Sequence, residues 1–159
     1  MTQLATLYQT DYAQWARRNA ELLAARRFDE LDIAHLLEEL GDMSKSDRRE
    51  LYSRLLVLLA HLLKWQYQLP TLAERWQEFK GDSWRATLVE QREQIADLLR
   101  HSPGLKTALA AAIADAWPGA VRLAHKETRL PLDRFPAACP YTDAQILDDE
   151  FYPEGTPPT

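Results

Sequence analysis

The chain has 159 residues, enough for one domain with a hydrophobic core and too few for two domains of ordinary size. Its composition, 46% hydrophobic and 27% charged, is typical of a soluble globular protein, and the formal net charge of -5 leaves no basic excess for binding a nucleic-acid backbone. The single cysteine excludes an internal disulfide and fits a reducing cytoplasm.

The amino-terminal residues contain no charged segment followed by an apolar run, so we expect no secretion signal. The longest apolar run, Leu55–Leu63, is interrupted by His61 and is far shorter than the roughly 20 residues that span a bilayer. We therefore predict a cytoplasmic protein that binds neither membranes nor nucleic acids.

The hydrophobic periodicity is helical nearly throughout, and no segment alternates as a strand would. A first helix is predicted to start at Thr6 or Thr10 and to end at Arg26. After a cap at Asp29 or Asp32, a second helix is predicted over about Leu31–Leu40, with a stop at Gly41. The residues that this second helix should bury are Ile33, Leu36, Leu37 and Leu40. Its opposite face holds His35, Glu38, Glu39 and Asp42.

Ser44, followed by Asp47 three residues later, has the form of a capping box with Asp in place of Glu, and it predicts the start of a third helix. This helix should run to about Gln68, because Pro70 disfavours a helical conformation in the residue before it. One short helix is predicted around Ala73–Phe79.

A fourth helix is predicted from a cap at Asp82 or Ser83 to His101, where "SPG" ends it. Pro103 suits the first turn of a fifth, alanine-rich helix, which Pro118 should kink or interrupt. The last segment should be extended apart from a short helix at Thr142–Leu147. Five hydrophobic residues should hold it against the helices: Leu130, Leu132, Phe135, Tyr141 and Phe151.

These elements predict an all-α fold. We expect a single-domain helical bundle of about five main helices over residues 1–153, with the extended C-terminal segment packed on it and a short flexible tail at residues 154–159.

The third predicted helix is apolar nearly all round, which is typical of a central helix, but it also carries a polar stripe. The stripe residues fall in an arc of about 80°: Glu50, Arg54, Val57, His61, Lys64 and Gln68. Asn19 and Gln91 similarly interrupt the apolar stripes of the first and fourth helices. One interpretation is structural, with Asn19, His61 and Gln91 each paired inside the bundle. The other is a ligand pocket at His61, Lys64 and Gln68, assisted by Gln91 or Arg92.

Other candidate sites are weaker. A metal site from His35-x-x-Glu38 and His61 lacks a repeated motif and has Lys64 beside it, so we expect no metal and no cofactor. Arg85 and Arg92 could grip a carboxylate or phosphate, or could pair with acids of a neighbouring helix: Glu38, Glu39 or Glu50. Cys139, beside a proline, is expected to be a buried, inert thiol.

Three blocks of sequence resemble the bacterial domain of unknown function 29 family: "HLLKWQYQ" (61–68), "SWRATLVEQREQI" (83–95) and "LPLDRFPAACPYTDAQILDDEFYP" (130–153). The opening residues 8–40 resemble the start of that family too. The resemblance implies an all-helical fold with no established activity, so there is no catalytic set to carry over. Its signature blocks contain these candidate residues: His61, Lys64, Trp65, Gln68, Trp84, Arg85, Gln91 and Arg92. Pro118 departs from the uninterrupted helix expected there.

For function, we predict a small interaction or regulatory module without catalysis, whose partner is another protein or a second copy of the chain. Trp76 and Trp117, at predicted loop edges, could mark the partner surface. The alternative is a ligand-binding protein or enzyme with its polar pocket at His61, Lys64 and Gln68.

Overall fold

The structure, a computed structural model, describes residues 2–75 and 81–154, with the side chains of 73–75 excepted. Within these residues it contains helices and turns and no strand, which confirms the all-α prediction. The chain divides into two compact units, Met1–Ser46 (unit 1) and Asp47–Thr159 (unit 2). The helix α3 (Ile33–Tyr67) belongs to both, so a single domain over 1–153 stays a prediction.

Unit 1 begins with two helices where the sequence predicted one, α1 (Gln3–Thr10) and α2 (Tyr12–Ala24). The break lies at Asp11, whose backbone is not helical (φ -152°, ψ 83°) and whose carboxylate accepts a hydrogen bond of 3.0 Å from the Gln14 amide. Aspartate favours this capping position because it satisfies an amide that the helix leaves unpaired. The short turn η1 (Phe28–Glu30) then leads into α3.

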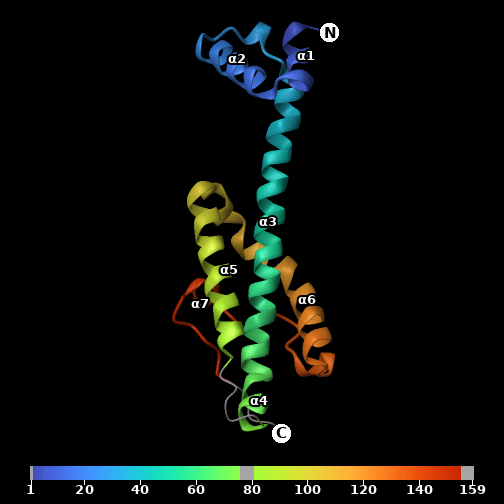
Figure 1. Ribbon diagram of the computed structural model, residues 1–159, viewed down its shortest axis with the longest axis vertical. Helices are drawn as coiled ribbons and strands as arrows, with labels where there is room; N and C mark the ends of the chain where they lie inside the picture. The colour runs from blue at the N-terminus through green and yellow to red at the C-terminus, as the bar shows by residue number, and fades with distance from the viewer. Residues whose placement is uncertain (1, 76–80, 155–159) are drawn as a thin grey trace. The chain divides into compact units, whose positions relative to one another are not determined.

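The helix α3 runs without interruption through Gly41, so the predicted stop at Gly41 and the new start at Ser44 are wrong (Figure 1). A glycine in a helix interior costs roughly 1 kcal/mol relative to alanine. Ending one helix and nucleating another would cost more, because nucleation fixes several residues for a single hydrogen bond. Asp47, the expected cap partner of Ser44, instead accepts a hydrogen bond of 2.8 Å from the Ser102 hydroxyl.

The predicted burial of the first turns of α3 is also wrong. Ile33, Leu37 and Leu40 are 51%, 66% and 61% exposed, and Leu36 is half-buried. The polar residues on the other side of the helix make the contacts with α1 and α2.

Unit 2 is built around the second half of α3, as the apolar run predicted. Its core joins α3 to α5 (Asp82–His101), α6 (Leu109–Thr128) and the C-terminal segment, and Figure 1 shows α5 and α6 on either side of the green part of α3. Seven residues of α3 have no exposed surface: Leu51, Leu55, Leu58, Leu59, Ala60, Leu62 and Leu63.

Several helix ends in unit 2 differ from the predictions. The predicted short helix forms earlier, as α4 (Leu69–Arg75), and the rest of its expected range lies outside the described residues. The cap of α5 is Gly81 in the left-handed region (φ 70°), where no side-chain bond from Asp82 or Ser83 is needed. A 3-10 turn, η2 (Pro103–Ala108), precedes α6, so Pro103 starts this turn and not, as predicted, the alanine-rich α-helix, which begins at Leu109.

Pro118 does not interrupt α6. The helix continues to Thr128, and its residues around the proline are buried: Ile113, Ala116, Trp117, Gly119, Ala120 and Ala124. Proline removes one backbone hydrogen bond at a cost of roughly 3 kcal/mol. Burial of this apolar face offsets that cost.

The C-terminal segment packs on unit 2, with η3 (Leu132–Arg134) and α7 (Asp143–Leu147) within it. The predicted short helix is confirmed, and Thr142 and Gln145 form a capping box at its start. Phe135 and Tyr141 are buried, whereas Leu132 is 51% exposed and was wrongly predicted to be an anchor. Apart from Glu154, the predicted tail lies outside the described residues.

Candidate functional site

The polar stripe of α3, called the seam from here on, lies among polar partners inside unit 2. Lys64 is 8% exposed, forms an ion pair with Glu127 of α6, and places its Nζ 5.6 Å from the ring centroid of Trp84 on α5. His61 is half-buried, and its Nδ1–H donates to the Val57 carbonyl one turn earlier, over 2.8 Å. These contacts support the structural interpretation of the seam, since the charge of Lys64 is matched from a neighbouring helix.

The environment of His61 favours its neutral form. Burial lowers the pKa of His61 from its usual value, and the nearby charge of Lys64 lowers it further. The hydrogen bond to Val57 and the charge of Glu127 act in the opposite direction and do not outweigh burial. In the neutral ring Nδ1 carries the proton that bonds to the Val57 carbonyl, so Nε2 is the unprotonated nitrogen.

The other predicted pocket residues do not join this pair. Gln68 is half-buried at the end of α3. Gln91 accepts a long hydrogen bond of 3.4 Å from Arg54, which also pairs with Glu50. The described contacts therefore divide the five predicted residues between several local networks.

Arg92 holds the C-terminal segment. Its guanidinium is 2% exposed and donates to the Ile146 carbonyl (2.9 Å) and the Phe151 carbonyl (2.8 Å), while its Nη1 has no partner within the described residues. Burial lowers the pKa of Arg92, and Tyr152 and the acidic residues Asp148 and Asp149 oppose that shift. Arg92 thus links α5 to a segment more than fifty residues later in the chain.

Arg85 was predicted, with Arg92, to bind an anion or to pair with acids. Its Cζ lies over aromatic rings, 4.9 Å from the ring centroid of Tyr152 and 5.8 Å from that of Trp65. The predicted ion pairs of Arg85 and Arg92 with helix acids are not among the described ones. Glu50 pairs with Arg54, and Glu39 binds two tyrosines.

Asn19 is paired as predicted, with partners of its own. It is 3% exposed, its amide donates to the Trp15 carbonyl (2.9 Å), and its oxygen accepts from the Asp32 amide (3.1 Å). Trp117, predicted to mark a partner surface, is 3% exposed and donates to the Pro136 carbonyl, so that prediction is wrong. Trp76 lies outside the described residues.

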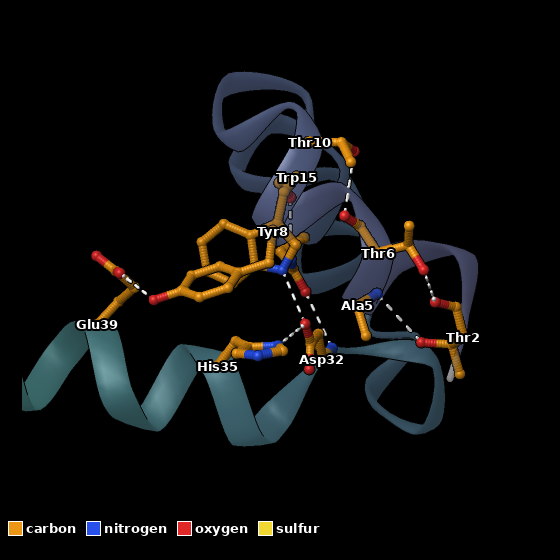
Figure 2. Close-up of polar contacts among 10 residues, drawn as sticks. Thr2, Ala5, Thr6, Tyr8, Thr10, Trp15, Asp32, His35 and Glu39 are labelled. Carbon is orange, nitrogen blue, oxygen red and sulfur yellow. Dashed lines mark hydrogen bonds and ion pairs between the residues drawn. The ribbon is translucent and has the colours of Figure 1, made fainter.

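An aromatic cluster that the sequence did not reveal lies in unit 1, where α1 and α2 meet the first turns of α3 (Figure 2). The rings of Tyr8 and His35 stack with their centroids 4.0 Å apart, and Trp15 meets the ring of Tyr8 edge-on at 4.8 Å. Both tyrosine hydroxyls donate to the carboxylate of Glu39, that of Tyr8 over 2.5 Å and that of Tyr12 over 2.7 Å.

Asp32 forms the second polar centre of this cluster, as Figure 2 shows. Its Oδ2 accepts from the Trp15 indole (2.9 Å) and lies 2.6 Å from the Nδ1 of His35. Burial alone would raise the pKa of Asp32, but these hydrogen bonds and the charge of His35 outweigh it, and the pKa is lowered. The tyrosine hydrogen bonds lower the pKa of Glu39 in the same way.

The cluster has an aspartate–histidine pair but no activated nucleophile. The hydrogen bonds to Glu39 raise the pKa of both Tyr8 and Tyr12, so both phenols stay protonated. The arrangement is suited to holding α1 and α2 on the polar side of α3. The signals that could have revealed it are the spacing of Tyr8, Tyr12 and Trp15 and that of His35 and Glu39, each three or four residues apart in the sequence.

Because the polar side of α3 is packed, its uncharged side is exposed. Six residues fall within an arc of about 120° centred on Leu37, and all six are exposed; we call them the uncharged α3 face: Ile33, Ala34, Leu37, Leu40, Gly41 and Ser44. Met43, 61% exposed, borders it. An apolar stripe of this width is normally the side that a helix turns toward a core.

Four surface hollows lined by described residues lie away from the seam, and none of them is lined by His61, Lys64 or Gln68. One of about 520 Å³ follows the outer side of α5, around Val89. Within the described residues, no three His, Cys, Asp or Glu side chains gather as metal ligands, and no helix is both long and apolar enough to cross a bilayer. Burial raises the pKa of the Cys139 thiol, which is half-buried beside the Tyr141 carbonyl.

Comparison with known families gives one match. The family model described as "Domain of unknown function DUF29" matches residues 7–152, which include both the aromatic cluster and the seam. The comparisons with curated proteins and with solved structures give no match. The match covers far more than half of the chain and confirms the resemblance found in the sequence, so the protein belongs to the DUF29 family.

Proposed function

We propose that this protein is a cytoplasmic, non-catalytic interaction module, and that the uncharged α3 face is its docking surface. The observation that carries the proposal is the exposure of Ile33, Leu37 and Leu40 (51%, 66% and 61%) on one side of a well-formed helix. Monomeric proteins seldom leave several large aliphatic side chains together in water, and such patches commonly mark interfaces.

The packing on the other side of the helix explains why the face is left free. Hydrogen bonds from Tyr8 and Tyr12 to Glu39, and from Trp15 to Asp32, attach unit 1 to the polar side of α3. No apolar contact of the uncharged face is needed to form the unit. The occupant that fits this face is an apolar side of a helix from another polypeptide, since a flat helical stripe packs best against a second helix.

Photo-crosslinking in cells tests this proposal. A photoreactive amino acid in place of Ser44 lies on the face without removing a leucine, and the same group in place of Glu93, exposed on α5, is the matched control. We expect adducts to a protein, identified by mass spectrometry, from position 44 and not from position 93. Adding Leu37→Lys should remove them.

Two results would contradict the proposal. One is the absence of any protein adduct from position 44. The other is an adduct that persists unchanged with Leu37→Lys, because it would show that the contact does not depend on the apolar residues of the face.

A further inference from the structure

We infer that the occupant of the uncharged α3 face is a second copy of the chain, paired antiparallel so that Glu38 of each copy faces Lys45 of the other. This inference rests on the proposed function and names its partner. It is carried by the charges that flank the face and by the small residues within it.

The flank of the face carries one acid and one base. On an ideal helix Glu38 and Lys45 point about 100° and 80° away from Leu37, to the same side. They are seven residues apart, about 10 Å along the axis, which is too far for them to pair with each other within one helix. Neither has an ion pair in the part of the chain that the structure describes.

The symmetry of a helix pair determines which flanks of the two copies lie together. A two-fold axis perpendicular to two facing antiparallel helices brings the same flank of both copies together. With the axis level with Gly41 and Asp42, Glu38 of each copy lies level with Lys45 of the other, and two equivalent ion pairs form. A parallel pair would instead set Glu38 beside the opposite flank, which carries Leu36 and Met43 and offers no base.

The interior of the face suits the same register. Gly41 of both copies would lie at the axis, Leu40 of one copy would meet Leu40 of the other close to it, and Leu37 would lie beside Ser44 of the other copy. Both of these small residues are exposed, and no atom lies within 4 Å of a Cβ built on Gly41, so a second backbone can approach closely. The face is short, so we expect a reversible dimer with a dissociation constant in the micromolar range.

Sedimentation of the purified full chain across a range of concentrations measures this dimer. Leu37→Lys and Leu40→Lys should each weaken it at least about a hundredfold, because each places a charge in the apolar interface twice. Leu132→Lys, at a side chain 51% exposed in unit 2, is the matched control and should leave the dissociation constant unchanged. Circular dichroism verifies that the variants fold, since these side chains are exposed.

A charge exchange tests the orientation. Glu38→Lys alone and Lys45→Glu alone should each weaken self-association about tenfold, because two attractions become two repulsions. An equimolar mixture of the two single variants should form a mixed dimer within about threefold of the natural affinity, since every facing pair is again opposite in charge.

A chain that stays monomeric up to millimolar concentration would overturn the inference. So would a dimer that is indifferent to Leu37→Lys, or single charge variants that fail to pair when mixed. If the chain is monomeric but position 44 crosslinks to another protein in cells, the proposed interaction module stands and only the second copy is wrong. If the chain stays monomeric and position 44 gives no protein adduct, both the second copy and the proposed function are wrong.

Discussion

At the scale of single residues, His61 and its neighbour Lys64 each have a polar partner within unit 2. The ring nitrogen of His61 bonds to the backbone of its own helix, and Lys64 and Glu127 form an ion pair close by. The sequence identified the polar stripe correctly. It could not show that Glu127, from a helix sixty residues later, would meet Lys64.

The protonation of His61 should make stability depend on pH. Its pKa is lowered by burial in the folded chain from a usual value of about 6.5, so the unfolded chain binds this proton more readily. Stability should therefore fall as the pH decreases through about 6.5 and stop falling, for this group, below the folded pKa. Urea unfolding at a series of pH values measures the effect, and His61→Gln should flatten the dependence.

The matched control for this experiment is His101→Gln, whose side chain is 76% exposed. It should leave the pH dependence of the natural protein in place. If the free energy of unfolding depends equally on pH in His61→Gln and in the natural protein, the seam does not disfavour the charged imidazole. A fold that stays as stable as before, together with a ligand that only the natural protein binds, would favour the pocket interpretation.

At the scale of elements, Arg92 fastens the C-terminal segment to α5 through two carbonyls. We expect Arg92→Leu to lower the free energy of unfolding by about 2–3 kcal/mol, because each hydrogen bond to a charged group contributes about 1.5–3 kcal/mol and removal of a buried charge offsets part of the loss. The segment around Ile146–Phe151 should also become sensitive to protease. Chemical denaturation and limited proteolysis followed by mass spectrometry give the two readouts.

Arg100→Leu on the same helix is the control for Arg92→Leu. Its guanidinium is 62% exposed and contacts only exposed acids, so the change should stay within about 0.5 kcal/mol. A similar loss of stability in both variants would mean that Arg92 does not act through the C-terminal segment.

Two glycines should respond in opposite directions to alanine. Gly41 lies in the middle of α3 with open space around it, so Gly41→Ala should stabilise the chain by about 0.5–1 kcal/mol. Gly81 has φ 70° and would bring a Cβ to 3.1 Å from Leu69 and Trp65, so Gly81→Ala should destabilise it by about 1–2 kcal/mol. Urea unfolding at low protein concentration compares them. A destabilising Gly41→Ala would contradict a continuous α3.

The helix ends show how far element boundaries can be predicted from the sequence. Glycine, proline and capping residues correctly marked the ends near Gln68, His101 and Thr142. Gly41 failed as a stop signal because its local cost is small compared with the cost of nucleating a second helix. The break at Asp11 was missed because the apolar spacing continues across it.

At the scale of the whole molecule, stability should be unevenly distributed along α3. Residues 40–46 are all exposed, whereas most of the helix between Leu55 and Lys64 is buried in the core of unit 2. Backbone amides near residues 41–46 should therefore exchange with deuterium far faster than those near 58–63. Hydrogen exchange with mass spectrometry at low protein concentration measures this difference, and equal protection in the two segments would contradict it.

Hydrogen exchange measured at high protein concentration tests the proposed dimer. Protection of residues 33–46 should rise with protein concentration and should not rise in the Leu37→Lys variant. The buried half of α3 serves as the internal control because its protection does not depend on association.

The sequence by itself determined that this protein is all-helical, that a central apolar helix organises unit 2, and that a capped short helix lies near the C-terminus. These follow from periodicity and local propensity, which act over neighbouring residues. Only the tertiary structure decided which side of α3 is covered in unit 1. Periodicity shows which residues share a side, but the aromatic rings and hydrogen bonds of Tyr8, Trp15, Asp32 and Glu39 brought the polar side into contact and left the leucines exposed.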